Sequence, residues 1–307
     1  SVTADFSPRT WNLAFVSSIL ISPTLGSVEA YDTQCNLFAF AAGINNVTGT
    51  EYAAWISSTA SNAVSRLGGA RGWVKMDGTP FADAPSALVT ENQVFQPLDL
   101  DETGARRTWE VVMTGTWHNG TVVDQNNCND WTRLGDTVAV GTTAAGPVRW
   151  SLSYYRGCDQ PYRIYCLGTT RIVALSPPVT TGKRIWLSNS PYIPDPATTP
   201  DEACAVDQPG ARALVATTTV PASTVIDPGS TYVAMNGQLV GTGAELLAAG
   251  RLQSGIWQYH DGTYLDYHVV IAWTGSQQGS DLTGLGTWEG TCHDWTSHVG
   301  GRGRHAR

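Results

Sequence analysis

The segment from Asp99 to Glu110 has the residue types and spacing of a calcium-binding loop. Asp99, Asp101 and Thr103 place side-chain oxygens at alternate positions. Gly104 follows where such a loop turns sharply, and Glu110 supplies the carboxylate that closes it. Calcium takes oxygen ligands at this spacing, so the pattern is compatible with a calcium site.

Two features favour a hairpin turn over a calcium site in this segment. Arg106 stands where a calcium loop packs an apolar residue, and residues 109–112 resemble a β-strand rather than a helix. We therefore predict a hairpin turn and no cofactor. Asp99, Asp101 and Glu110 remain the candidate ligands for the calcium alternative.

A second group of metal-ligand residue types lies in the C-terminal half. It consists of His260, Asp261, Asp266, His268, His293 and His298. Imidazole and carboxylate groups bind zinc, so a metal-dependent enzyme is one hypothesis. The competing interpretation is a solvated hairpin, because the chain has no His-Glu-x-x-His pattern. It also lacks a Gly-x-Ser-x-Gly elbow, a P-loop and a dinucleotide fingerprint, and we predict that the protein is not an enzyme.

Aromatic residues in polar, loop-like surroundings give a stronger functional signal. Trp, Tyr and Arg anchor many interfaces, and aromatic rings also stack on sugar rings. The predicted ligand-binding residues are Trp117, Trp150, Tyr154, Tyr155, Trp257 and Tyr259. The competing interpretation is that most of the 12 Trp residues fill small hydrophobic cores.

The composition narrows the class of protein. The chain has 307 residues, only 14% of them charged, and a net charge of −8. Without clustered Lys and Arg it is a poor candidate for nucleic-acid binding. No apolar stretch approaches the roughly 18 residues of a membrane span. Six scattered cysteines and many Trp are typical of an exported, disulfide-bonded protein, with six buried thiols as the alternative. We expect a secreted or cell-surface location.

The two halves of the chain repeat the same short segments in the same order. The matched pairs are 73–78 with 232–237, 113–116 with 273–276, 128–132 with 292–296, Leu88 with Leu247, and Cys35 with Cys204. Each copy is too long for a short-repeat solenoid. The repeat therefore predicts two tandem domains, at residues 1–170 and 183–307, joined by a linker at 171–182 that contains Pro177 and Pro178.

Each half begins with a short helix and continues as brief β-like runs. In the first half we expect Asp32 to cap a helix that carries Cys35, and residues 201–204 hold the second helix. Asp77-Gly78 after an apolar run predicts a hairpin. Further strands are expected at 111–113, 163–167 and 269–271. The predicted class is α+β, with short helices, small antiparallel sheets, long loops and disulfides.

The order of these motifs resembles the bacterial endostatin-like domains, which have a C-type-lectin-like fold. The motifs are the helix with Cys35, then residues 54–57, 74–78, 114–116, 127–132, Cys158 and 163–166. The match covers residues 11–168 and, more loosely, 183–298. The resemblance implies two nested disulfides, Cys35 with Cys166 and Cys128 with Cys158. It also implies adhesion to extracellular proteins or glycans.

The second copy departs from the family pattern after Trp295. The closing Cys and the Tyr-Cys strand are missing before Arg307, so Cys204 and Cys292 lack their family partners. Three interpretations stay open. The two cysteines pair with each other, they bond another chain in a covalent oligomer, or a C-terminal piece of the second copy has been removed.

Asn129-Asp130 beside Trp131 is similar to the calcium-and-sugar motif of true C-type lectins, in which the Trp comes first. No Glu-Pro-Asn or Gln-Pro-Asp motif accompanies it. The spacing Cys128-x-x-Trp131 and Cys292-x-x-Trp295 instead predicts that each Trp packs in a core against a disulfide.

The sequence therefore favours a non-catalytic secreted or cell-surface binding protein that uses loop aromatics on a lectin-like scaffold. Its expected partner is an extracellular protein or glycan, or a further copy of the chain, without nucleic acid and without a membrane span. The alternative is a structural subunit of an extracellular filament or surface layer, assembled through the incomplete second domain. A metal-dependent enzyme is the third hypothesis.

Overall fold

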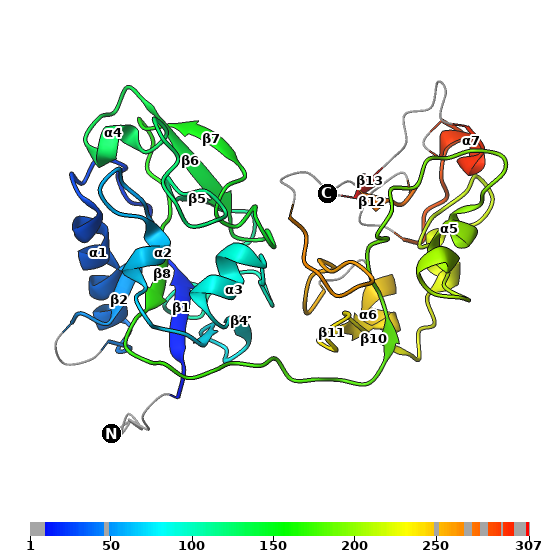
Figure 1. The fold of residues 1–307 in the computed structure, drawn as a ribbon, viewed down its shortest axis with the longest axis horizontal. Helices are drawn as coiled ribbons and strands as arrows, with labels where there is room; N and C mark the ends of the chain where they lie inside the picture. Colours follow the sequence, from blue (N-terminus) through cyan, green and yellow to red (C-terminus); the bar gives the residue numbers. More distant parts are fainter. Residues whose placement is uncertain are drawn as a thin grey trace. The chain divides into compact units, whose positions relative to one another are not determined.

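The protein consists of two compact units, Ser1–Pro177 and Pro178–Arg307. The boundary falls inside the predicted linker at 171–182. The computed structural model describes residues 10–45, 49–248, 252–266, 272–276, 282–289, 291–297 and 305–306. Both units are α+β, with short helices, small sheets and long loops (Figure 1).

Unit 1 contains four helical segments and eight strands among its described residues. The helices are α1 (Val28–Ala41), α2 (Ala63–Arg66), α3 (Pro85–Thr90) and α4 (Cys128–Trp131). The strands are β1 (Asn12–Val16), β2 (Tyr52–Ala54), β3 (Trp73–Val74), β4 (Pro80–Ala82), β5 (Val111–Met113), β6 (Thr137–Thr142), β7 (Tyr154–Gly157) and β8 (Tyr165–Gly168).

The larger sheet of unit 1 has the strand order β2-β8-β1-β3-β4. It is mixed rather than purely antiparallel, because β1 and β3 run parallel while the other neighbours are antiparallel. The last strand of the unit, β8, pairs with the first strand, β1, with Phe15 opposite Cys166. The two ends of the unit are thereby joined in the centre of one sheet.

The smaller sheet of unit 1 is antiparallel, with the order β5-β6-β7. Its β5 side is closed by the chain around Arg163, which accepts a backbone hydrogen bond from Met113 at 2.9 Å and donates one to Val111 at 3.3 Å. Strand β7 forms the opposite edge (Figure 1). The strand predicted at 111–113 is confirmed, and the one predicted at 163–167 begins later, at Tyr165.

The predicted hairpin at Asp77-Gly78 is present between β3 and β4. Gly78 has a φ of +80°, which is accessible to Gly without a steric cost. The Asp77 carboxylate accepts a hydrogen bond from the Thr79 backbone N–H at 3.0 Å. Lys75 N–H donates to the Thr79 carbonyl at 2.8 Å and closes the turn.

Helix α1 begins one turn earlier than predicted. Its N-cap is Ser27, whose hydroxyl accepts a hydrogen bond from Ala30 N–H, and not Asp32. Burial of Val28 and Tyr31 adds the extra turn, because both side chains pack into the core. Asp32, inside the helix, accepts a hydrogen bond from Ala54 N–H at 2.7 Å and forms an ion pair with Arg66.

Tryptophan dominates the core of unit 1. The fully buried side chains include Trp55, Trp73, Trp131 and Trp150. Two of the indole N–H groups form hydrogen bonds inside the core. Trp55 donates to the Ser151 hydroxyl and Trp73 to the Gly168 carbonyl, both at 2.8 Å. Such bonds offset the cost of burying the polar indole N–H in an apolar core.

Unit 2 repeats part of this arrangement among its described residues. Its elements are β9 (Lys183–Arg184), α5 (Pro200–Asp207), a 3₁₀ turn (Ala222–Val225), β10 (Thr231–Val233), β11 (Leu239–Thr242), α6 (Gly243–Leu247), β12 (Ala272–Trp273), α7 (Cys292–Trp295) and β13 (His305–Ala306). The order β11-β10-β9, with β9 parallel to β10, matches β4-β3-β1 of unit 1.

The cores of the two units are built around equivalent hairpins. Among the described residues of unit 2, one hydrophobic cluster consists of Ile226, Tyr232, Ala234, Val240 and Leu246. Leu246 is the buried residue, and Leu247, the predicted anchor, is only partly buried. The strand predicted at 269–271 lies outside the described residues, and β12 begins directly after it.

Candidate ligand-binding surface

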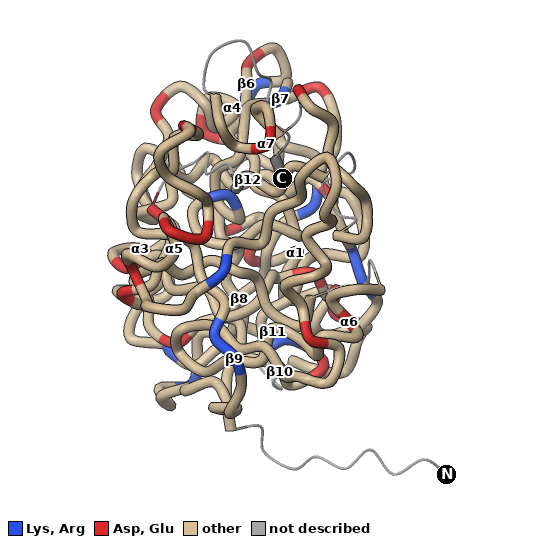
Figure 2. The backbone as a smooth tube through the Cα atoms, turned by 90° about the vertical axis from the view of Figure 1, so that its right-hand side faces the viewer, with Lys and Arg blue, Asp and Glu red and all other residues tan. Residues whose placement is uncertain are grey.

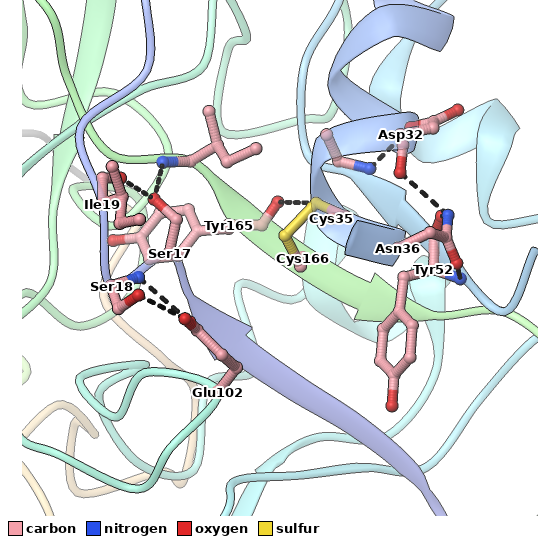
Figure 3. The surroundings of a disulfide bond; sticks show 12 residues. Ser17, Ser18, Ile19, Asp32, Cys35, Asn36, Tyr52, Glu102, Tyr165 and Cys166 are labelled. Atoms are coloured by element: carbon pink, nitrogen blue, oxygen red, sulfur yellow. Dashed lines mark hydrogen bonds between the residues drawn. A yellow bond between two sulfur atoms is a disulfide. The ribbon is translucent and has the colours of Figure 1, made fainter. Parts of the chain in front are cut away.

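Two buried disulfides fix the scaffold of unit 1, with the pairing that the resemblance implies. Cys35–Cys166 joins α1 to β8, and Cys128–Cys158 joins α4 to the residue that follows β7. Figure 3 shows the first bridge between the helix and the strand. On the same helix, Asn36 binds both backbone groups of Tyr52, at 2.8 and 3.1 Å. Helix α1 and the sheet are therefore held by covalent and polar contacts together.

The repeated Cys-x-Asp-Trp segments form one turn of left-handed helix in both units. All four residues from Cys128 to Trp131 have φ between 50° and 67°, and those from Cys292 to Trp295 have φ between 51° and 67°. Such a conformation costs roughly 1–2 kcal/mol per non-Gly residue, so surrounding contacts must hold it. The Asn127 side chain in unit 1 and the Thr291 side chain in unit 2 cap the turn by accepting from the Asp N–H.

The Asp of each turn binds a threonine from a distant loop. Asp130 accepts the Thr59 backbone N–H at 2.8 Å and also its hydroxyl. Asp294 accepts the same two groups of Thr218, both at 2.7 Å. Burial alone would raise the pKa of Asp130, but the hydrogen bonds from Thr59 and Asn127 favour the carboxylate and lower it. The pKa of Asp294 is lowered in the same way.

The Trp of each turn is buried, but only Trp131 packs against a disulfide as predicted, because Cys292 in unit 2 is a thiol. Trp131 lies in one hydrophobic cluster with Cys128 and Cys158, and its indole donates to the Ser57 carbonyl at 3.0 Å. Trp295 donates to the Ala216 carbonyl at 2.8 Å. The two units thus share one local structure, in which a left-handed turn places a Trp side chain in a buried position.

The candidate calcium ligands bind cationic side chains. Asp99 pairs with Lys75 at 3.3 Å and with Arg106, while Glu110 pairs with Arg163 at 3.3 Å. Asp101 binds Arg107 at 2.8 Å.

The segment turns as a hairpin. Leu100 and Arg106 form an antiparallel bridge, and Asp101 N–H donates to the Ala105 carbonyl at 2.9 Å. The Asp101 carboxylate also accepts Thr103 and Ala105 N–H, each at 2.9 Å. Among the described residues no group of three or more His, Cys, Asp or Glu side chains is arranged to hold a metal ion. Calcium binding stays the untested alternative, and these ion pairs disfavour it.

Trp150 was predicted to contact ligand, and the structure contradicts this. Its side chain is 1% exposed. The ring lies 4.8 Å from that of Trp55, 5.2 Å from Phe81 and 5.4 Å from Tyr165. Trp150 completes an aromatic cluster in the core, and the neighbouring Ser151 is also buried, where its hydroxyl accepts a hydrogen bond from the Trp55 indole at 2.8 Å.

The other predicted aromatics are partly or largely accessible. Trp117 packs against a small cluster of Val123, Ala139 and Leu152, and Trp257 and Tyr259 are half-buried in unit 2. Tyr154 is half-buried, with the Arg156 guanidinium 4.7 Å above its ring. Tyr155 is 46% exposed and is the most open of the six predicted residues.

Trp109 is one of the exposed aromatics that the sequence interpretation missed, together with Phe40 and Trp288. The Trp109 side chain is 68% exposed, and its φ of +61° excludes the strand expected to begin there. The residues around it are held firmly. Arg107 N–H donates to the Asp99 carbonyl at 2.7 Å, and the Thr143 hydroxyl donates to the Arg107 carbonyl. The Thr143 hydroxyl oxygen also accepts Glu110 N–H at 3.0 Å.

A left-handed backbone is expensive for a bulky residue. Such outliers cost about 1–3 kcal/mol and persist only where the surrounding structure imposes them. Here the imposed conformation holds a large apolar side chain in water, so core packing does not compensate for it. The local sequence offers one signal, since Trp109 is preceded by two arginines and followed by Glu110, which is unusual for a buried indole.

Trp109 lies at the same end of the small sheet as Arg149 and the start of β7. Thr143, just after β6, donates its N–H to Glu110, just before β5, at 3.1 Å. Thr142 N–H binds the Arg149 carbonyl at 3.2 Å. Strand β7 begins opposite Val140 at this end. An aromatic anchor, an arginine and an exposed tyrosine are thus gathered at one end of three paired strands.

His260, Asp261 and His293, three of the metal-ligand residue types of unit 2, make other contacts, and the described Asp266 is exposed. His260 lies 5.1 Å from the ring of Trp186, and Asp261 accepts Thr263 N–H at 2.9 Å. His293 stacks on Trp288 at 5.0 Å, and the Trp288 side chain is 56% exposed. His268 and His298 lie outside the described residues.

Cys204 and Cys292 are thiols, and they occupy the places of Cys35 and Cys128 in the repeat. Burial, followed by the charges of Asp201 and Asp207, raises the pKa of the Cys204 thiol. The structure has no disulfide between them, so the interpretation in which the two cysteines pair with each other is not borne out. A covalent oligomer and a removed C-terminal piece stay predictions.

Comparison with known protein families and with curated proteins finds no match to this chain. Within the described residues, no helix is both long enough and apolar enough to cross a membrane.

Proposed function

We propose that the protein is a non-catalytic, extracellular binding protein whose ligand contacts the Trp109 end of the β5-β6-β7 sheet. The scaffold would be a pair of C-type-lectin-like, endostatin-like domains, which the sequence motifs favour. Disulfides within a chain fit an oxidising, extracellular environment. The ligand would be an extracellular protein or a glycan.

The conformation of Trp109 carries the proposal. Hydrogen bonds to Arg107 and Glu110 fix the backbone on both sides of the exposed Trp109, so little backbone entropy is lost when it binds a ligand. Trp is also enriched among the residues that dominate binding energy. The neighbouring charges are balanced, because Asp99, Asp101 and Glu110 each pair with an arginine. The charged positions are scattered over the described backbone and form no extended basic run (Figure 2).

The test is a screen of wild-type protein and a Trp109→Ala variant against arrays of glycans and extracellular matrix proteins. We expect wild-type binding that Trp109→Ala abolishes. The matched control is Trp288→Ala, which removes an exposed indole from unit 2 and should leave binding intact. Wild-type protein that binds nothing, or a ligand retained by Trp109→Ala, would overturn the proposal. The structural-subunit hypothesis stays a separate prediction, and the mass of native protein with and without reductant tests it.

A further inference from the structure

Strand β7 presents an edge with open backbone hydrogen-bonding groups. Cys158 N–H donates to the Asp136 carbonyl at 2.9 Å, and Tyr154 and Arg156 lie opposite Val140 and Val138. Backbone groups alternate in direction along a strand, so Tyr154 and Arg156 face β6 while Tyr155 and Gly157 face away.

Of the backbone groups that face away from β6, some form hydrogen bonds within unit 1 and others do not. The Gly157 carbonyl accepts the Tyr162 hydroxyl at 2.7 Å. Within the described part of unit 1, the Tyr155 N–H and carbonyl form no hydrogen bond. The Tyr155 side chain is also open to solvent. An exposed edge of this kind is a template for an added strand.

The edge is rigid because both of its ends are anchored. Gly157 leads directly into Cys158, whose disulfide to Cys128 fixes the end of the strand. At its start, Ser153 N–H donates to the Val140 carbonyl at 2.7 Å. A strand edge that is already ordered loses little conformational entropy when it binds an extended segment.

Arginines without carboxylate partners accompany this edge. In the described part of unit 1, the Lys and Arg side chains that form ion pairs are Arg66, Arg71, Lys75, Arg106, Arg107, Arg163 and Arg171. Those that do not are Arg133, Arg149 and Arg156. Arg149 binds the Ser153 hydroxyl at 3.0 Å, and Arg156 lies over the Tyr154 ring. Their charges remain available in a chain of net charge −8.

We infer that the β7 edge binds an extended acidic segment of a partner protein as an added strand. Main-chain bonds to Tyr155 would supply the pairing, and carboxylates would pair with Arg149 and Arg156. The inference rests on the proposed function in that the same end of the sheet contacts the partner. It adds the partner's chemistry, an extended polypeptide carrying alternate acidic side chains.

The test measures fluorescence anisotropy of a short labelled peptide of alternating valine and glutamate, titrated with the full chain. We expect saturable binding that weakens with salt, since the pairs are solvent-exposed. Arg156→Glu should weaken it by at least about tenfold, because it replaces an attraction by a repulsion. Tyr155→Pro should do the same, because it removes the outward N–H and leaves the bonds to β6.

The controls keep the outcome decisive. Arg212→Glu changes an exposed arginine of unit 2 and should bind as wild type does. A valine–lysine peptide, and the glutamate peptide with all amides N-methylated, should not bind wild-type protein. The N-methylated peptide tests strand pairing even if Tyr155→Pro does not fold. Absent binding of the glutamate peptide, or equal binding by either control peptide, would overturn the inference. Loss of array binding in Trp109→Ala would still support the proposed function, so the two failures are distinguishable.

Discussion

At the residue scale, the exposed fraction of each Trp side chain separates core residues from candidate ligand-binding residues. Trp109 and Trp150 both follow polar residues in the sequence, yet one is exposed and the other is among the most buried side chains of the protein. The difference lies in tertiary contacts, because Trp150 meets three aromatic rings contributed by distant segments. The residues next to Trp150 in the sequence do not indicate that these rings pack together. The sequence interpretation therefore placed the buried Trp150 among the exposed aromatics and left out the exposed Trp109.

The two kinds of Trp should differ sharply in their effect on stability. We expect Trp131→Ala to lower the free energy of unfolding by about 3–5 kcal/mol, since it leaves a cavity in the core. Trp109→Ala should change it by less than about 1 kcal/mol, because little packing is lost. Urea unfolding followed by circular dichroism measures both. A large loss of stability in Trp109→Ala would mean that its role is structural.

Gly115 tests how tightly the left-handed turn is packed. Its φ is +57°, and an added Cβ would lie 2.8 Å from Cζ2 of Trp131 and 3.0 Å from Cβ of Asn127. We expect Gly115→Ala to cost about 2–4 kcal/mol from backbone strain and overpacking together. Gly135→Ala, where nothing lies within 4 Å, is the matched control and should be nearly neutral. Equal melting temperatures for the two variants would contradict the packing described for the turn.

At the element scale, the repeated turn and the disulfides position the sheets. The sequence predicted the strand at 111–113, the Asp77-Gly78 hairpin and the burial of Trp131, because these depend on short patterns. The resemblance, and not the spacing, supplied the cysteine pairing. The start of α1 was missed because its first turn is added by the burial of Val28 and Tyr31, which is a tertiary effect.

The two disulfides should differ in their contribution to stability. Cys35–Cys166 spans 131 residues and Cys128–Cys158 spans 30. In the chain-entropy account these loops correspond to about 5 and about 3.5 kcal/mol. Replacing each pair by alanines and measuring the urea midpoint should give the larger loss for the outer bridge. The reverse order would show that contacts around the inner bridge, rather than loop length, dominate.

The Asp–Thr clamps predict a pH dependence of stability. The pKa of Asp130 and of Asp294 is lowered in the folded protein. A carboxylate of this kind stabilises the fold above its unfolded pKa of about 3.9, and that stabilisation is lost as the pH falls through the folded pKa. Wild-type melting temperature should therefore drop below about pH 4. The double variant Asp130→Asn and Asp294→Asn should melt lower at neutral pH and show a smaller drop in acid. Parallel curves for both proteins would exclude the clamps as the titrating groups.

At the scale of the whole molecule, the two units differ in how many disulfides stabilise them. Unit 1 holds both disulfides and the large tryptophan core, whereas the described residues of unit 2 contain no disulfide. Calorimetry should resolve two transitions, with unit 1 unfolding at the higher temperature. Reductant should lower only that transition. A single transition, unaffected by reductant, would contradict two units of independent stability.

The central claim is that ligand binds at Trp109. The most direct measurement is the dissociation constant of one array ligand for wild-type protein, Trp109→Ala and Trp288→Ala. A Trp that becomes buried in the complex contributes at least about 2 kcal/mol to the binding free energy. Trp109→Ala should therefore bind at least about 30-fold more weakly. Trp288→Ala should match wild type. Equal affinity of Trp109→Ala and wild type, with both proteins folded, would contradict the account.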